Sequence, residues 1–283
     1  MKLKIILGIL AILILALVAV VLINESAFKR GVDAEVTALF QNAGPSDTTV
    51  VTEADLAHLP PPIQRYLRRS QVVGKPKVQF VRLRQRGTIR RGPEEAWMPF
   101  EAEQYYSVNP PGFVWHVRAS IFPLLSMVGR DKYVEGKGNM HITLLSTITV
   151  VDVSGPELDQ GAFVRFLSEI VWFPSAWLSD YLTWEPIDSS SAKVTMRDAG
   201  IGASAIIFVN EQGDITNFTA DRIMAVGDSS RTERWSTPMT GYGESGGFRI
   251  PTQGEAVWQL ESGDFSYIRL EVISIEYNKN SLY

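Results

Sequence analysis

The residue types best suited to chemistry in this chain lie in a glycine-rich stretch at residues 241–247. Gly243-Glu-Ser-Gly-Gly247 fits a nucleophile elbow, and Gly241, Gly243 and Gly246 fit a dinucleotide-binding loop. Both motifs require a strand before them and a helix after them. The residues from Phe248 onward alternate like a strand, and no histidine follows Ser245, as the hydrolase order would require. We therefore interpret this stretch as a turn.

The other groups that could react are isolated. His58, His116 and His141 share no spacing that suits a metal ion, so we interpret them as separate structural residues. The chain has no cysteine, which excludes disulfides, thiolate nucleophiles and cysteine-bound metals. Paired carboxylates such as Glu101 and Glu103 are not tied to any nucleophile. We expect no catalytic residue, no metal and no cofactor, and we favour a non-catalytic protein over an enzyme.

Basic residues gather at residues 57–92, where there are ten lysines or arginines and no acid. Nucleic-acid binding is not expected, because the whole chain carries a net charge of −4 and no aromatic residues are interleaved with these arginines as stacking platforms.

Arg82, Arg84 and Arg86 lie in a predicted strand, where alternate residues share one face. Like charges in a row repel one another, so one interpretation is a structural ladder with acidic neighbours such as Glu101 and Glu103 on the next strand. The other is that these arginines attract anionic lipid head groups. Both interpretations stay open.

A predicted helix at residues 157–173 carries large apolar side chains on one face, and further aromatic residues follow it. These side chains form either the core beneath the helix or the wall of an apolar cavity for an acyl chain or similar ligand. The candidate ligand-binding residues are Phe163, Phe166, Leu167, Trp172 and Trp177.

An uninterrupted apolar run at residues 5–23 follows a short tail, residues 1–4, and is long enough to span a bilayer. A cleaved signal peptide is the alternative, but the run lacks the small residues typical of a cleavage site. Lys2 and Lys4 favour a cytoplasmic N-terminus, although Lys29 and Arg30 nearly balance them. We therefore expect a single-pass protein of the cell membrane, with its domain on the extracytoplasmic side.

The rest of the chain divides into a helical neck at residues 24–74 and a β domain at residues 75–283. In the β domain the apolar pattern switches to a period of two, and short turn signals separate the strands. Such short connections require antiparallel pairing, because parallel strands need long crossovers. We predict a mainly β fold with a curved antiparallel sheet.

Several segments resemble a family of uncharacterised bacterial membrane-anchored proteins of unknown function. They are EAEQYYSVNPPGFVWH at 101–116, GGFRIPTQGEAVW at 246–258, and shorter matches at 59–70, 159–162, 171–174 and 267–272. The resemblance covers most of residues 56–277 and implies no catalytic residue.

The C-terminal Gly-Phe-x-Ile-Pro strand with one last hairpin is similar, more distantly, to the LolA/LolB lipoprotein-carrier superfamily. That resemblance implies an unclosed β barrel with a helix packed on its concave face, which would bind acyl chains. It makes the helix at 157–173 the candidate liner of a lipid-binding groove.

Together these features favour a membrane-anchored, non-catalytic domain that binds a lipid or another apolar ligand at the membrane surface. Two alternatives remain: a structural or interaction protein of the cell envelope without a ligand cavity, or a hydrolase with an unrecognised site. The expected partners are the lipid bilayer through residues 5–23, an apolar ligand and an envelope protein.

Overall fold

The computed structural model describes residues 2–45, 49–123, 125–227 and 229–283. One antiparallel sheet of fourteen strands dominates it. The strands are β1 (Phe80–Ile89), β2 (Met98–Ser107), β3 (Gly112–Phe122), β4 (Leu125–Val134), β5 (Lys137–Leu144), β6 (Ile148–Ser154), β7 (Leu182–Pro186), β8 (Ser191–Asp198), β9 (Ile201–Val209), β10 (Ile215–Val226), β11 (Ser229–Ser236), β12 (Met239–Ser245), β13 (Phe248–Leu260) and β14 (Gly263–Tyr277).

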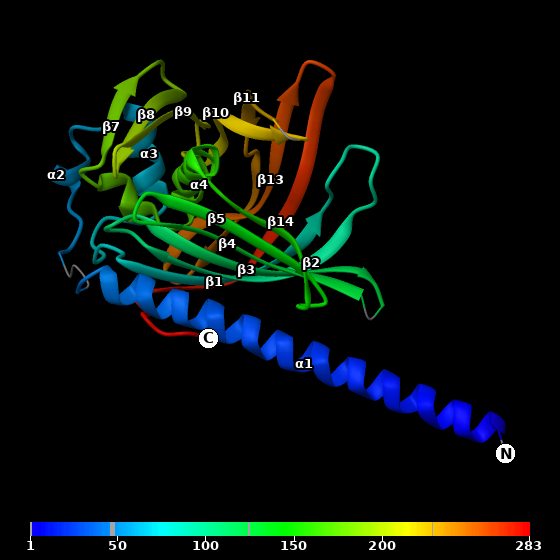
Figure 1. The fold of residues 1–283 in the computed structure, drawn as a ribbon. Helices are drawn as coiled ribbons and strands as arrows, with labels where there is room; N and C mark the ends of the chain where they lie inside the picture. Colours follow the sequence, from blue (N-terminus) through cyan, green and yellow to red (C-terminus); the bar gives the residue numbers. More distant parts are fainter. Residues whose placement is uncertain (1, 46–48, 124, 228) are drawn as a thin grey trace.

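The strands follow the order β6-β5-β4-β3-β2-β1-β14-β13-β11-β10-β9-β8-β7, and β12 pairs with β13. The sheet curls into an unclosed half-barrel whose two walls, β1–β6 and β7–β11, face each other across a helix (Figure 1). We call the face toward that helix the inner face and the opposite one the outer face. The predicted fold class, a mainly β curved antiparallel sheet with a helix on its concave face, is confirmed.

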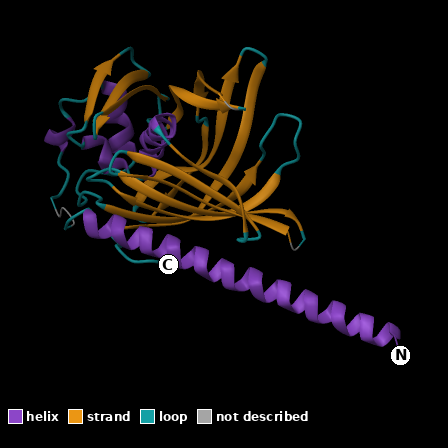
Figure 2. Ribbon diagram, in the orientation of Figure 1, coloured by secondary structure: helices purple, strands orange, loops and turns teal. Residues whose placement is uncertain are grey.

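Helix α1 (Lys2–Asn42) forms one continuous rod. Its first part, to about residue 23, is exposed and projects away from the body, whereas its second part lies along the outer face (Figure 2). Val32, Val36, Leu39 and Phe40 recur at helical spacing and are buried there. The polypeptide therefore passes from the apolar run into the neck without a hinge.

Two short helices, α2 (Glu53–Leu56) and α3 (Pro61–Arg69), follow α1. Pro61 and Pro62 occupy the first positions of α3, where the missing N–H of proline costs no helical hydrogen bond. The buried side chains of α3 join the main core, so α3 closes one end of the half-barrel.

The helix on the inner face is α4 (Pro156–Glu169), and it continues into two 3₁₀ turns, η1 (Ile170–Trp172) and η2 (Pro174–Leu178). The predicted helix at 157–173 is therefore α-helical only to Glu169, and it continues as the 3₁₀ turn η1. Phe173 leaves helical geometry with φ −135° and ψ 74°, as expected for a residue before proline.

The alternating pattern of residues 139–153 predicts one long strand, but the structure forms a hairpin of β5 and β6 there. Leu145 and Ser146 both have positive φ, near 52° and 53°, and make the turn. These residue types rarely adopt that conformation, so the sequence contained no turn signal here.

Candidate functional site

The candidate residues of the inner face are brought together in one packed core. Phe163, Phe166, Leu167, Trp172 and Trp177 are each no more than 6% exposed. They fill the space between the two walls of the half-barrel, so the inner face is occupied by the chain's own α4–η2 segment.

Aromatic rings of the sheet surround these side chains. The ring of Phe163 lies 5.6 Å from that of Tyr133, and the ring of Phe166 lies 6.3 Å from that of Tyr106. The ring of Trp177 stacks on Trp184, 5.1 Å away. The packing therefore extends from β2 and β4 on one wall to β7 on the other.

A buried charged cluster joins α4 to the sheet. The Nη1 of Arg165 donates to Oδ2 of Asp131 at 2.6 Å, and its Nε donates to Oε1 of Glu169 at 2.9 Å. The Oε2 of Glu169 accepts hydrogen bonds from Nε2 of Gln104 at 2.8 Å and from the hydroxyl of Tyr106 at 3.0 Å. Burial raises the pKa of Glu169, and the neighbouring Arg165 guanidinium opposes that rise.

Arg165 and Arg222 sit inside the half-barrel on aromatic rings. The guanidinium of Arg165 lies 4.5 Å from the ring of Trp115, and that of Arg222 lies 4.7 Å from the ring of Trp235. The Nε of Arg222 also donates to the carbonyl oxygen of Gly161 in α4 at 3.0 Å. One arginine on the helix and one on the sheet thus fasten α4 to opposite walls.

The first turn of α4 makes further polar ties. Oδ1 of Asp159 accepts from the backbone N–H of Gly138 at 2.7 Å. The side-chain Oε1 of Gln160 accepts from the backbone N–H of Ile223 at 3.1 Å, and its Nε2 donates to the carbonyl oxygen of Asp221 at 3.2 Å. Polar contacts therefore hold the helix at β5 and β10.

Sequence reasoning missed this polar interior. Arg165 and Glu169 are four residues apart in α4, which is the spacing of an ion pair on one face. That spacing was the available signal, whereas the sheet partner Asp131 is far away in the sequence.

Three side-chain atoms on the floor of the half-barrel lack hydrogen-bond partners among the described residues. They are Nε2 of Gln85, Oε1 of Gln104 and Oδ1 of Asp131, all in buried side chains of β1, β2 and β4. Buried polar atoms are normally paired, so unpaired ones mark a place suited to a polar group or a water molecule.

The arginines predicted to form a ladder lie on the outer face, each within ion-pair distance of an acid. Arg82 pairs with Glu276 at 2.9 Å, and Arg86 pairs with Glu271 at 2.7 Å, both across to β14.

Arg84 lies 3.5 Å from Glu103 on β2, and its guanidinium lies 4.0 Å from the ring of Tyr283. Arg84 and Glu103 are direct cross-strand neighbours in the register of β1 and β2. Binding of lipid head groups by these arginines stays a prediction.

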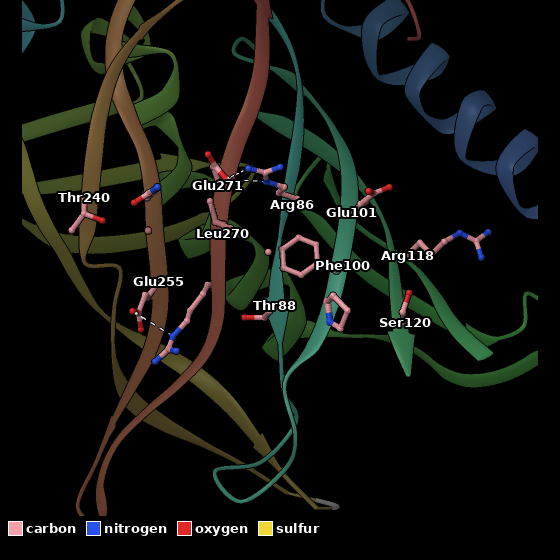
Figure 3. A pocket seen from close by; sticks show the side chains of 15 residues that line it. Arg86, Thr88, Phe100, Glu101, Arg118, Ser120, Thr240, Glu255, Leu270 and Glu271 are labelled. Carbon is pink, nitrogen blue, oxygen red and sulfur yellow. Dashed lines mark hydrogen bonds and ion pairs between the residues drawn. The ribbon is translucent and has the colours of Figure 1, made fainter. Parts of the chain in front are cut away.

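An open hollow of about 710 Å³ lies on the outer face where β1–β3 meet β13 and β14 (Figure 3). Its charged lining residues are three arginines and three glutamates: Arg86, Arg118, Arg269, Glu101, Glu255 and Glu271. Glu271 pairs with Arg86, and Glu255 lies 3.5 Å from Arg269. The hollow is therefore balanced in charge and does not favour an ion of either sign.

A second hollow of about 480 Å³ lies between the start of β1 and η2, lined by Gln79, Ser175 and Tyr181 among others. Neither hollow includes the five candidate residues of the inner face.

Two of the three histidines lie beside α1. His116 and His141 are on the outer face, with ring centroids 6.0 and 5.4 Å from the ring of Phe28 in α1. The Nε2 of His141 lies 3.4 Å from Oγ1 of Thr149. Across residues 2–45, 49–123, 125–227 and 229–283, no group of three or more His, Asp or Glu side chains could hold a metal ion.

Solved structures of two bacterial proteins match the chain at low identity. A LolA superfamily protein from Nitrosomonas europaea is 11% identical, with a TM-score of 0.39; the match covers 83% of this chain and 95% of that one. A structure described as an outer membrane lipoprotein-sorting protein domain, from Vibrio parahaemolyticus, is 7% identical, with a TM-score of 0.37 and coverage of 71% and 86%. At these identities the likeness concerns the fold alone.

No curated protein matches the chain. The family described as "Family of unknown function (DUF6544)" matches residues 49–270, which is most of the chain and nearly all of the sheet. The chain therefore belongs to the DUF6544 family.

Proposed function

We propose that this protein is a membrane-anchored, non-catalytic domain that binds a lipid or another apolar ligand on the inner face of its half-barrel. The observation that carries the proposal is an unclosed sheet lined with aromatic side chains and spanned by one segment of the chain, α4–η2, which polar ties fasten at both walls. A ligand would reach this face when that segment shifts.

The chemistry of the inner face suits an amphipathic ligand. Apolar burial contributes roughly 0.8 kcal/mol for each CH₂ group, so an acyl chain among these aromatic side chains would gain substantial affinity. The unpaired atoms of Gln85, Gln104 and Asp131 offer both hydrogen-bond donors and acceptors to its polar end.

The proposed membrane anchor is the first part of α1. The helix is long and apolar enough to cross a membrane. Its residues from Leu3 to Ile23 leave their large apolar side chains exposed, which soluble proteins rarely do over such an area. The helix would hold the binding face beside the bilayer that supplies the ligand.

A test is to reconstitute the full chain in lipid nanodiscs that contain a photoactivatable fatty acid, and to map the adducts by mass spectrometry. We expect adducts in residues 156–178 and on the sheet strands beneath them, in addition to those in residues 2–23. Gln160→Ala removes two ties of α4 to β10 and should increase the inner-face adducts. Lys193→Ala, which removes an exposed ion pair on β8, is the matched control and should change nothing.

The close packing of the inner face favours a second candidate, an envelope interaction protein whose half-barrel is a solid scaffold. All five candidate residues are buried against the chain itself, and both described hollows lie elsewhere. Adducts confined to residues 2–23 in the wild type and in both variants would exclude ligand binding on the inner face and support this second candidate.

A further inference from the structure

Two hairpins, β3–β4 and β5–β6, lie beside the point where α1 leaves the sheet. The side-chain Nδ2 of Asn24 donates to Oγ1 of Thr147, in the turn between β5 and β6, at 3.2 Å. Next to it, Glu25 forms an ion pair with Arg118 of β3. The first residues of α1 to contact the body thus follow directly after Ile23, the last residue of the apolar run.

These contacts fix the height of the hairpins relative to the bilayer that α1 would cross. Below Asn24 the helix continues straight and its apolar side chains are exposed. The membrane boundary set by the apolar run therefore lies at the level of Thr147 and Arg118. In Figure 1, β3, β4 and β5 point their lower ends in the direction of the N-terminal part of α1.

The hairpin ends carry large apolar side chains that no other part of the described chain covers. Phe122, at the end of β3, is 68% exposed. Ile148 and Val150, at the start of β6, are 60% and 54% exposed. Phe122 and Ile148 lie at the strand ends next to the β3–β4 and β5–β6 turns, and Val150 lies two residues after Ile148. Most of the other large apolar side chains of the body are buried.

The strand geometry carries Phe122 past the membrane boundary. Phe122 lies four residues beyond Arg118 on β3, and a strand rises roughly 3.3 Å per residue, so Phe122 reaches up to about 13 Å beyond the level of Glu25. Because the apolar run ends at Ile23, directly before Asn24 and Glu25, a side chain beyond that level extends into the layer that the run would occupy.

We propose that Phe122, Ile148 and Val150 form a membrane-inserted rim, so that the half-barrel rests on the lipid surface instead of standing off it on α1. This inference rests on the membrane anchor in the proposed function, but not on ligand binding. With Phe122 on β3 and Ile148 and Val150 on β6 inserted in the lipid beside α1, the body cannot rotate about the helix. The rim gives the domain a fixed orientation toward the bilayer.

The test uses single-cysteine variants of the full chain, which has no native cysteine. Phe122→Cys and Ile148→Cys report on the rim. Leu22→Cys reports on the apolar run, and Ile187→Cys reports on an exposed position next to β7, away from α1. Each variant carries an environment-sensitive fluorophore and sits in a phosphatidylcholine–phosphatidylglycerol nanodisc, one chain per disc, with nitroxide-labelled acyl chains. All four positions are exposed, so labelling does not disturb the core.

We expect the nitroxide lipid to quench the fluorescence of the labels at positions 122 and 148 about as strongly as that of the label at position 22. The fluorescence of the label at position 187 should not change. Quenching at 22 without quenching at 122 and 148 would overturn the rim while leaving the anchor intact. No quenching at 22 would refute the anchor itself, and the rim with it. Blue-shifted but unquenched emission at 122 and 148 would assign these side chains to a protein contact and also overturn the rim.

Discussion

At the scale of single residues, the interior of the half-barrel is organised by charge as well as by apolar packing. Arg165 forms ion pairs with two carboxylates, those of Asp131 and Glu169, and lies on the ring of Trp115. Each of these groups is costly to bury alone, since a charge without a partner in the interior retains little solvation. The cluster therefore holds α4 in one position and makes that position dependent on all of its members.

We predict that Arg165→Met lowers the free energy of unfolding by about 3–5 kcal/mol, because it leaves two carboxylates buried without their cation. The measurement is urea unfolding of the reconstituted chain, followed by tryptophan fluorescence. The control is the triple variant Arg165→Met, Asp131→Asn, Glu169→Gln, which removes all three charges and should recover part of the loss. Equal stability of the single variant and the wild type would show that the cluster does not hold α4.

At the scale of elements, α1 is one helix with two environments. Its first part has no partner in the described chain, and its second part packs on β2 and β3 through a stripe that includes Val36 and Phe40. The ring of Phe40 lies 5.4 Å from that of Phe80 and 6.1 Å from that of Tyr105. These contacts therefore fix the orientation of α1 relative to the sheet.

Phe40→Ala should detach the second part of α1 from the sheet. Truncating a buried phenylalanine lowers stability by about 3–5 kcal/mol. We expect the remaining contacts of this stripe to be too weak to prevent local opening of the helix. We expect faster hydrogen exchange at the backbone amides of residues 32–42, measured by mass spectrometry, with strand amides of β8 and β9 unchanged. The control is Leu13→Ala, in the exposed part of α1, which should not change hydrogen exchange at any amide outside its own helical turn. Unaltered protection in Phe40→Ala would mean that other contacts hold α1.

At the scale of the whole molecule, the apolar run of α1, the half-barrel and the hairpin ends define one direction. The apolar run projects from the body in the direction in which the β3–β4 and β5–β6 hairpins point. Lys2 and Lys4 precede the run and favour a cytoplasmic N-terminus. We therefore predict that the half-barrel lies on the extracytoplasmic side.

A C-terminal fusion tests this orientation. The C-terminus lies on the outer face beside α1, where a fused domain can be attached. If the half-barrel is extracytoplasmic, we expect alkaline phosphatase fused after Tyr283 to be active in cells and a green fluorescent protein fused at the same point to be dark. Intact-mass analysis of the purified membrane fraction should show residues 1–23 retained. A fluorescent, phosphatase-negative pair would reverse the orientation, and a shortened mass would identify a cleaved signal peptide.

The sequence by itself determined the elements whose pattern is local. The period of two after residue 75 predicted an antiparallel sheet, and the spacing of Phe163, Phe166 and Leu167 predicted an inward-facing helix. The run at 5–23 predicted a helix long enough to span a bilayer. Alternation also put Arg82, Arg84 and Arg86 on one face. Each of these predictions needs only neighbours within a few residues.

Only the tertiary structure decided which distant groups meet. The pairing of Arg165 with Asp131, the seating of α1 on the outer face and the level of Phe122 relative to Asn24 depend on how the sheet curls and on which wall each strand occupies. The β5–β6 turn was hidden for a related reason: Leu145 and Ser146 accept positive φ because the paired strands on either side hold them there. Side-chain periodicity specifies a face of an element, but long-range packing specifies what that face touches.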